Sequence, residues 1–452
     1  MRQMFLQKSK YSEMLKLAIP LIMANSGNTI MQFVDGVFLA HHSDVEIAAA
    51  GGASVICWLA TSILCGAVAY TSTMVSNLYG AKKMERVGTA VWQGFYLALL
   101  GSAVIALLSL FCGMLFRAAG HTAELAAKET IYCRINLCGG VFSMAQLAFS
   151  GFFSGRGDNT RLMLAQIAGQ GTNIVGDYVL IFGKFGFPEW GIAGAAIATV
   201  AGAVVTLGVL LSMMMTRKNR CTYATLRNWR PEFQLMRRLC SFGVPSGIGF
   251  FVDALIWTVF LMLMGRFGAV ELAASTICFR MNSIALLPTL GIGNAEGTLV
   301  GQSHGAGDDR EAMRYAGHGA VLCFVWMTSM ALTYILFPEF YIRLFVGEGT
   351  ENGADLLAMG SVFIRFVALY CTMDSLNVSL CAALNSVGDT RFGCMVVGGC
   401  SVVFCMAMLI GIGCFKADAT AIWTMVTIYV MILPFFWFLR LRSGRWKGRV
   451  VG

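Results

Sequence analysis

The sequence predicts an all-α integral membrane protein with twelve transmembrane helices in two six-helix repeats. Three observations lead to this fold class: an apolar composition, twelve apolar runs of membrane-spanning length, and short motifs that recur in the same order in both halves. Of the 452 residues, 57% are hydrophobic and 13% are charged, whereas soluble domains average about 25% charged residues. Most of the chain is therefore expected to lie in a lipid bilayer.

The apolar runs have the length that a transmembrane helix needs, because about 20 apolar residues cross a bilayer core of roughly 30 Å. Short polar segments separate these runs. The predicted spans are residues 15–40, 47–78, 89–116, 130–153, 161–183, 191–215, 240–266, 273–302, 315–337, 358–384, 392–415 and 419–439.

The basic residues predict the orientation. Polar segments on the side of the amino terminus hold 24 Lys and Arg residues, and those on the opposite side hold 6. Because cytoplasmic loops carry the excess of Lys and Arg, we expect a multi-pass protein of the cell inner (cytoplasmic) membrane with both termini in the cytoplasm. Basic residues spread over short loops form no patch for nucleic acid, so no nucleic-acid partner is expected.

Residues 216–239 form the longest polar segment and divide the spans into six and six. We predict an amino-terminal six-helix bundle over residues 1–215, a basic cytoplasmic linker over 216–239, and a carboxyl-terminal six-helix bundle with a basic tail over 240–452. The linker carries seven Lys and Arg residues.

The two bundles repeat each other. At an offset of 225, Pro20 meets Pro245 and VEIAAA at 45–50 meets VELAAS at 270–275. At an offset of 231, GRGDNTR at 155–161 meets NSVGDTR at 385–391. An even number of spans per repeat gives both halves the same orientation, as in one class of secondary transporters. Duplication without a transport role is the alternative.

Asp35 is the only full charge between Leu17 and Ala40, in the first span. A carboxylate at that depth costs roughly 2.5–3.5 kcal/mol on insertion scales, and is usually paired, protonated or bound to a cation. The alternative is an acid kept neutral by a neighbouring helix. An intramembrane acid indicates a functional site by default.

Several motifs share their order and spacing with a known family. They are Pro20 and VDGVFLA in the first span, GDYVLIFG followed by GIAGAAIAT at 176–199, and the turns GRGDNTR and VGDTR. Over nearly the whole chain they resemble the multidrug and toxic compound extrusion (MATE) family, in its NorM-like bacterial branch. The resemblance implies two helical bundles arranged as a V around a central cavity. It also implies export of amphiphilic organic cations and drugs in exchange for Na⁺ or H⁺.

The resemblance assigns cation coupling to four residues of the amino-terminal half. Asp35 matches the acid of the first span, and Asn173 and Asp177 match a pair in the fifth span. Thr199 matches a hydroxyl ligand in the sixth. The i, i+4 spacing puts Asn173 and Asp177 on one helix face. This oxygen-only set suits Na⁺, or the two carboxyls share one proton.

Three acids of the carboxyl-terminal half are further candidates. Asp253 and Asp374 match cation or substrate acids of spans 7 and 10, although the NorM-like branch commonly carries Glu at the first of these positions. The alternative is a structural pair satisfied by neighbours such as Asn377. Glu296, toward the cytoplasmic end of span 8, is expected to be a vestibule acid or a solvated one.

The remaining expectations concern chemistry and partners. The sequence has no Gly-x-x-x-x-Gly-Lys-Ser/Thr motif for ATP and no His-Glu-x-x-His motif, so we predict neither an ATP-driven pump nor an enzyme. No cofactor is expected besides the coupling ion, Na⁺ or H⁺. The expected partners are amphiphilic cationic small molecules and the lipid bilayer, and the chain is expected to be a monomer. Within transport, the alternative is a lipid-linked oligosaccharide flippase of a related fold.

Overall fold

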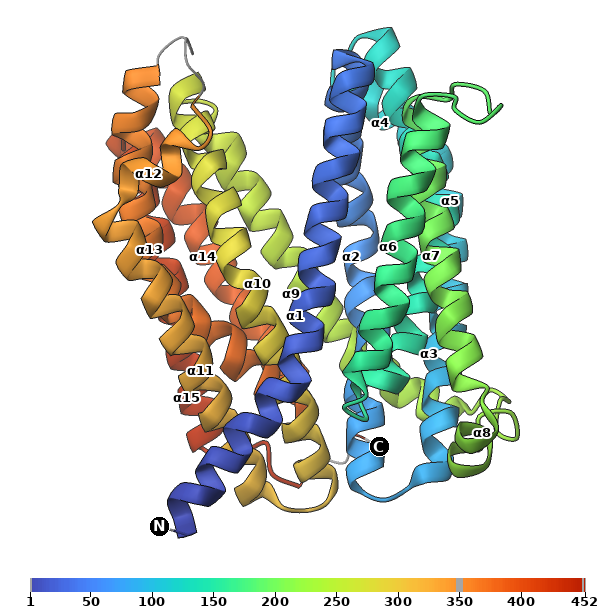
Figure 1. Cartoon of the computed structure of the whole chain (residues 1–452). Coiled ribbons are helices and arrows are strands. Elements are labelled where there is room, and N and C mark those ends of the chain that lie inside the picture. Colours follow the sequence, from blue (N-terminus) through green and yellow to red (C-terminus); the bar gives the residue numbers. More distant parts are fainter. Residues whose placement is uncertain (1, 347–352, 449–450, 452) are drawn as a thin grey trace. The chain divides into compact units, whose positions relative to one another are not determined.

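A computed structural model describes residues 2–346, 353–448 and 451, which contain helices and connections and no strand. Figure 1 shows the helices in chain order. The amino-terminal half contains α1 (Arg2–His42), α2 (Asp44–Gly80), α3 (Met84–Leu108), α4 (Cys112–Ala118), α5 (Ala123–Ser154), α6 (Asn159–Ile181), α7 (Ile192–Met214) and α8 (Arg217–Tyr223). The carboxyl-terminal half contains α9 (Phe233–Met264), α10 (Ala269–Gly305), α11 (Asp309–Leu336), α12 (Pro338–Arg343), α13 (Gly353–Ser386), α14 (Thr390–Phe415) and α15 (Ala419–Arg442).

Every predicted span coincides with helix, so the all-helical fold class is confirmed. A short 3₁₀ turn at Ser109–Phe111 separates α3 from α4 within the third span. Among the described residues, ten helical segments are long and apolar enough to cross a membrane by themselves. The two predicted spans outside this set lie on α1 and α6, the helices that carry Asp35 and Asp177. The total of twelve spans stays a prediction.

The chain forms two compact units that are not simple halves of the sequence. The carboxyl-terminal unit comprises Met1–Ile22, Gly249–Val300 and Asp308–Val450. The amino-terminal unit comprises Met23–Ile248, Gly301–Gly307 and Val451–Gly452. Helices α1, α9 and α10 thus each contribute residues to both units. The predicted bundle and linker boundaries at 215 and 240 describe the sequence repeat and stay a prediction.

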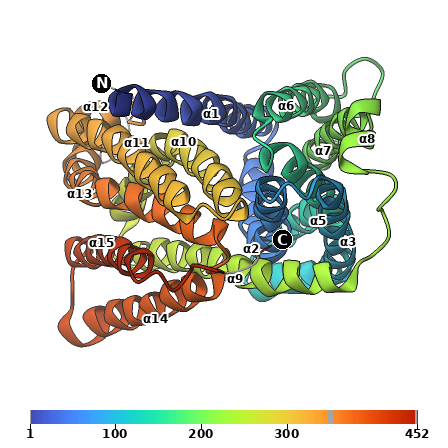
Figure 2. The ribbon, with the colours of Figure 1, turned by 90° about the horizontal axis from the view of Figure 1, so that it is seen from below.

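In the amino-terminal unit, α5 packs against α2, α3 and α7, and α6 packs against α7 (Figure 2). Glycines bring these helices close, as is typical of membrane helices, which pack through small residues. A Cβ at Gly151 of α5 would lie only 2.9 Å from the Ser72 backbone nitrogen of α2. The packing of α7 against α5, and of α6 against α7, positions the side chains described below.

In the carboxyl-terminal unit, α13 packs against α11 and α15. Trp423 of α15 is fully buried at the centre, where its ring stacks on Phe363 at 5.1 Å and contacts Phe260 at 5.3 Å. Its indole nitrogen donates to the Ser275 hydroxyl at 3.1 Å. A buried tryptophan with a satisfied N–H contributes a large apolar contact area without a polar penalty.

The two repeated turn motifs fold alike. Gly157 and Gly388 have φ angles of 79° and 81°, a left-handed conformation that glycine adopts without steric cost. The backbone amides of Asp158 and Asp389 donate to carbonyls of the preceding helix at 2.9 and 3.0 Å. The repeat between GRGDNTR and NSVGDTR therefore reproduces the same helix-ending turn.

We expect Arg440→Gln to destabilise the protein by about 3 kcal/mol, because breaking a buried ion pair leaves one charge uncompensated. The Asp389 carboxylate, 1% exposed, accepts from Arg440 Nε at 2.6 Å, and the guanidinium lies 4.5 Å from the Phe392 ring. Thermal unfolding in detergent measures the change. Arg343→Gln is the control, because its pair with Glu339 is exposed and surface pairs contribute about 0–1 kcal/mol. Equal shifts would contradict the prediction.

Candidate functional site

The structure brings the four predicted residues of the amino-terminal half together in one unit. Asp35 lies on α1, Asn173 and Asp177 on α6, and Thr199 on α7. The Asn173 amide donates to the Thr199 hydroxyl at 3.4 Å, and that hydroxyl donates to a backbone carbonyl of its own helix at 3.0 Å. This bond ties α6 to α7 at the depth of the candidate site.

Small residues and one side-chain bond set these helix positions. A Cβ at Gly202 of α7 would lie 2.8 Å from the Gly169 carbonyl oxygen and 3.2 Å from the Asn173 Cβ. The Gln170 amide of α6 donates to the Ala24 carbonyl of α1 at 3.0 Å. Glycine at 202 therefore allows α6 to approach α7 closely, and the Gln170 hydrogen bond joins α6 to α1.

The two carboxyl groups lie against each other. The Asp35 and Asp177 side chains are direct neighbours, and Asp177 is 0% exposed. One Asp35 oxygen, both Asp177 oxygens and the Asn173 amide oxygen have no hydrogen-bond partner within the described residues. Buried polar atoms normally have partners, so this set of oxygens fits a cation or a shared proton as the missing partner.

Sequence reasoning missed Tyr132. This residue of α5 lies close enough to both Asp35 and Asp177 for electrostatic interaction. Tyr132 is nine residues from the start of α5, a depth of about 14 Å at 1.5 Å per residue. Depth matching could have found it, but a tyrosine in an apolar run carries no signal of its own.

A charged network lies near the end of α1, also in the amino-terminal unit. His42 Nδ1 lies 2.8 Å from Glu46 of α2, and its Nε2 lies 2.8 Å from Glu189 in the connection between α6 and α7. Lys128 of α5 pairs with the same Glu46 carboxylate. These pairs join α1, α2, α5 and the α6–α7 connection. No local pattern predicts them, because most of their members lie far apart in the chain.

The carboxyl-terminal unit brings Asp253 of α9 and Asp374 of α13 close enough to interact electrostatically. Asp374 accepts from the Asn377 amide at 3.2 Å, and Asn377 accepts from Trp437 Nε1 at 2.7 Å. The Asp253 side chain is exposed. The hydrogen bond from Asn377 thus holds the Asp374 side chain in place, as expected for a structural pair. The role of Asp253 and Asp374 as a cation or substrate site stays a prediction.

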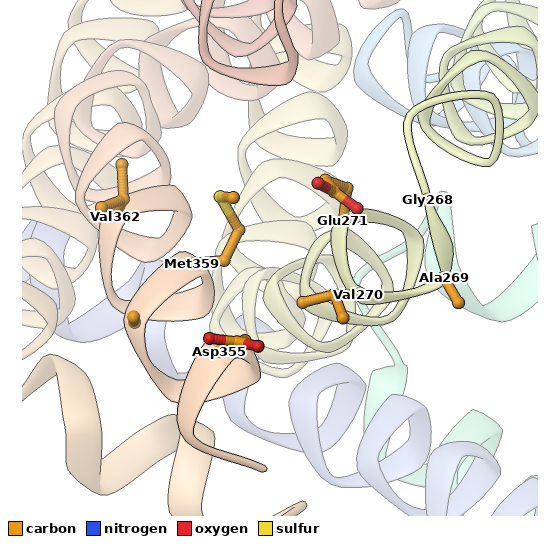
Figure 3. Close-up of a pocket in the computed structure, with 8 residues that line it drawn as sticks. Gly268, Ala269, Val270, Glu271, Asp355, Met359 and Val362 are labelled. Atoms are coloured by element: carbon orange, nitrogen blue, oxygen red, sulfur yellow. The ribbon is translucent and has the colours of Figure 1, made fainter. Parts of the chain in front are cut away.

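A separate pocket of about 610 Å³ in the same unit contains none of the predicted residues. It lies where α10 and α13 begin, and Figure 3 shows Glu271 and Asp355 bordering it from these two helices. Its two carboxylates would favour a cationic ligand over an anionic one.

One further segment matches the sequence pattern of a catalytic motif but does not adopt the fold that the motif requires. GQSHG at 301–305 has the form Gly-x-Ser-x-Gly, which acts as a nucleophile elbow only at a turn from strand to helix. Here the five residues lie inside α10. Gly305 packs against the Asn77 backbone of α2, so this segment serves helix packing.

Comparison with known proteins identifies a family. The MatE family model matches residues 20–179 and 245–410. A probable multidrug resistance protein NorM from Thermotoga maritima is 25% identical over 448 residues, which cover 97% of this chain and 94% of that protein. The multidrug resistance protein NorM from Burkholderia vietnamiensis is 28% identical over 380 residues, covering 83% of this chain and 81% of that protein.

Solved structures agree with the fold. A multidrug resistance MATE family transporter of the MOP superfamily in an outward-facing conformation has a TM-score of 0.87 and 20% identity, covering 96% of this chain and 95% of that chain. A MOP superfamily transporter from Pyrococcus furiosus gives the same TM-score, identity and coverage. At this identity the likeness shows the fold alone.

The family model matches one segment in each sequence repeat, and the two segments together cover most of the chain. The resemblance noted from the motifs is thereby confirmed. So is the prediction that the protein is not an enzyme, because MatE family members are transporters and the curated relatives are named multidrug resistance proteins. The chain belongs to the MatE family of membrane transporters.

Proposed function

We propose that this protein is a multidrug efflux transporter that works as a secondary antiporter, exporting amphiphilic organic cations across the cytoplasmic membrane in exchange for Na⁺ or H⁺. The observation that carries this proposal is the group of buried oxygens without partners on Asp35, Asn173 and Asp177. A bound cation, or a proton shared by the two carboxyls, would supply the interaction that these atoms lack.

The relatives support the export of drugs. The two proteins compared above are named as multidrug resistance proteins, and they match this chain over 83% of its length or more. The donor set supports the ion. Two carboxylates, an amide oxygen and a hydroxyl are hard oxygen ligands of the kind that small hard cations prefer. The same two carboxyls suit a proton equally well, so both ions remain within the proposal.

In the proposed mechanism, the ion-binding groups on α6 and α7 stay together, and Asp35 on α1 can move away from them. Asn173, Asp177 and Thr199 lie on two helices held by glycine packing and a side-chain bond. Asp35 lies on α1, which contributes residues to both compact units. One monovalent ion balances the charge of one carboxylate, and it contacts both carboxyls only when the Asp35 side chain lies next to that of Asp177. The ion therefore favours the conformation with the acids together, and a ligand shifts an equilibrium only by its differential affinity.

The acids of the carboxyl-terminal unit have a second role in this proposal. Asp253 is exposed and lies near Asp374, so the pair offers negative charge to an organic cation that approaches this unit. Asp374 is already held by Asn377, so we assign electrostatic attraction to the pair, without direct coordination of the coupling ion.

The test is export of a fluorescent lipophilic cation from proteoliposomes that contain the purified protein. One sample has an imposed sodium gradient with the pH gradient collapsed, and the other has a pH gradient without sodium. We expect one of the two gradients to drive export, and that result identifies the coupling ion. Movement under neither gradient would overturn the antiport proposal.

A further inference from the structure

Glu296 of α10 occupies an unusual environment within the carboxyl-terminal unit. Its side chain is 0% exposed, so the expectation of a solvated or vestibule acid is wrong. Neighbours in the sequence, Ala295 and Leu299, belong to a buried apolar cluster that also includes Met14 of α1 and Ala316 of α11. The carboxyl group therefore lies in the interior of the carboxyl-terminal unit, between packed helices, and not at an aqueous surface.

The polar contacts of this carboxyl group are few. The Ser379 hydroxyl of α13 donates to Oε2 at 2.7 Å, whereas Oε1 is buried without a hydrogen-bond partner within the described residues. The titratable group facing it from α11 is the Cys323 thiol. From α13 it faces the Ser379 hydroxyl, which does not titrate, and the α1 members of the cluster are the apolar Met14 and Ala18.

Space for the carboxyl group is created by a missing side chain. Gly319 of α11 faces Glu296, and a Cβ there would overlap Oε2 and the carboxyl carbon. Gly317, two residues earlier on the same helix, has open space at its Cβ position. Glycine at 319 is thus a steric requirement of the acid that lies between α10, α11 and α13.

The surroundings of the Glu296 carboxyl group favour its protonated, uncharged form. A carboxylate buried with one neutral hydrogen bond and no counter-charge is strongly disfavoured. A dehydrated hard cation would need several oxygen ligands, and the structure places a single side-chain hydroxyl, that of Ser379, in hydrogen-bond contact with the carboxyl. A proton requires only one oxygen without a partner, and Oε1 has none in the part of the chain that the structure describes.

We propose that Glu296 is a proton-binding site of the carboxyl-terminal unit, distinct from the Asp35 and Asp177 site of the other unit. The hydrogen bond from Ser379 marks Oε2 as the carbonyl oxygen, and the proton is on Oε1. Release breaks the Oε1–H bond, leaves its electron pair on the carboxylate and passes the proton to water. This requires α10, α11 and α13 to admit water, so the bound proton favours their close packing. The assignment does not depend on the proposed antiport.

Infrared spectroscopy of the full-length protein in lipid bilayers tests this proposal, because a protonated carboxylic acid has a carbonyl stretching band that a carboxylate lacks. Near neutral pH we expect Glu296→Gln to remove one such band. Ser379→Ala should shift that band to higher frequency, because the carbonyl oxygen loses its hydrogen bond. Gly319→Ala should also shift the band by displacing the carboxyl group, whereas Gly317→Ala should leave it unchanged.

The outcomes separate this proposal from the transport function. If Glu296→Gln removes no carbonyl band from the spectrum, the acid is ionised and the proposal is overturned. This holds whether or not the protein transports. If Glu296→Gln does not fold, Ser379→Ala keeps the acid in place and reports on the same band. An unshifted band in Ser379→Ala and in Gly319→Ala would likewise overturn it.

Discussion

Asp177→Asn is expected to weaken ion-driven export strongly, and Asp35→Asn to do the same, while both proteins remain folded. Each substitution keeps the shape of the side chain and removes the charge that would balance a bound cation or hold a proton. Both carboxyls are direct neighbours, so removal of either leaves a single acid that no longer binds the ion in the same way.

The size of the effect follows from the energy of one charged interaction. Hydrogen bonds and ion contacts to charged groups contribute roughly 1.5–3 kcal/mol, and every 1.4 kcal/mol is about tenfold in affinity. We therefore expect the apparent affinity for the driving ion to fall by about 10- to 100-fold in each variant. Initial rates of export in proteoliposomes at increasing ion concentration measure this change.

Asp44→Asn is the matched control, because Asp44 is an exposed acid at the start of α2 in the same unit. It should export at the wild-type rate. The prediction fails if Asp177→Asn retains wild-type dependence on both the sodium and the pH gradient, since the acid would then have no part in coupling.

Gly80→Ala is expected to destabilise the protein by about 3 kcal/mol, in the upper range for overpacking a tight contact. A Cβ at Gly80, the last residue of α2, would overlap the backbone carbonyl of Gln302 in α10. The Gln302 side chain also donates to the Gly155 carbonyl at 3.0 Å, and Gly305 packs on the Asn77 backbone. Backbone atoms on both sides cannot move aside as a flexible side chain would.

Gly51→Ala in the same helix is the control, and it is expected to change the stability in the opposite direction. Gly51 is exposed and has nothing near its Cβ position, and alanine in a helix interior is favoured over glycine by about 0.8–1.0 kcal/mol. Thermal unfolding in detergent should show a lower midpoint for Gly80→Ala and an equal or higher midpoint for Gly51→Ala. Equal midpoints for the two variants would contradict the packing argument.

The sequence predicted which segments are helical better than where each helix begins and ends. Hydropathy locates the bilayer, but a helix continues wherever its backbone bonds allow. Thus α9 begins at Phe233 and includes Arg237 and Arg238, within the segment predicted as linker, and α8 lies within the same segment. The break at Ser109 was also not foreseen, since the run 89–116 contains no proline.

The candidate site was predictable where spacing within one helix or a family motif applied. Asn173 and Asp177 share a face of α6 by periodicity alone. The contact between Asp177 and Asp35 depends on how α1 meets α6, which no local pattern encodes. For the same reason the burial of Glu296 was missed, because it depends on Ser379 and on the glycine at 319, both distant in sequence.

Because α1, α9 and α10 each contribute residues to both units, the order of synthesis constrains how the protein folds. α1 changes unit after Ile22 and α9 after Ile248, positions that correspond to within one residue at the repeat offset of 225. Each follows a repeat-related proline, Pro20 or Pro245, by a few residues. During synthesis the first 22 residues are therefore made before their partners, which follow residue 248, and the amino-terminal unit still lacks Gly301–Gly307 and Val451 when residue 248 has been made. Neither compact unit is therefore complete until the second half of the chain has been made.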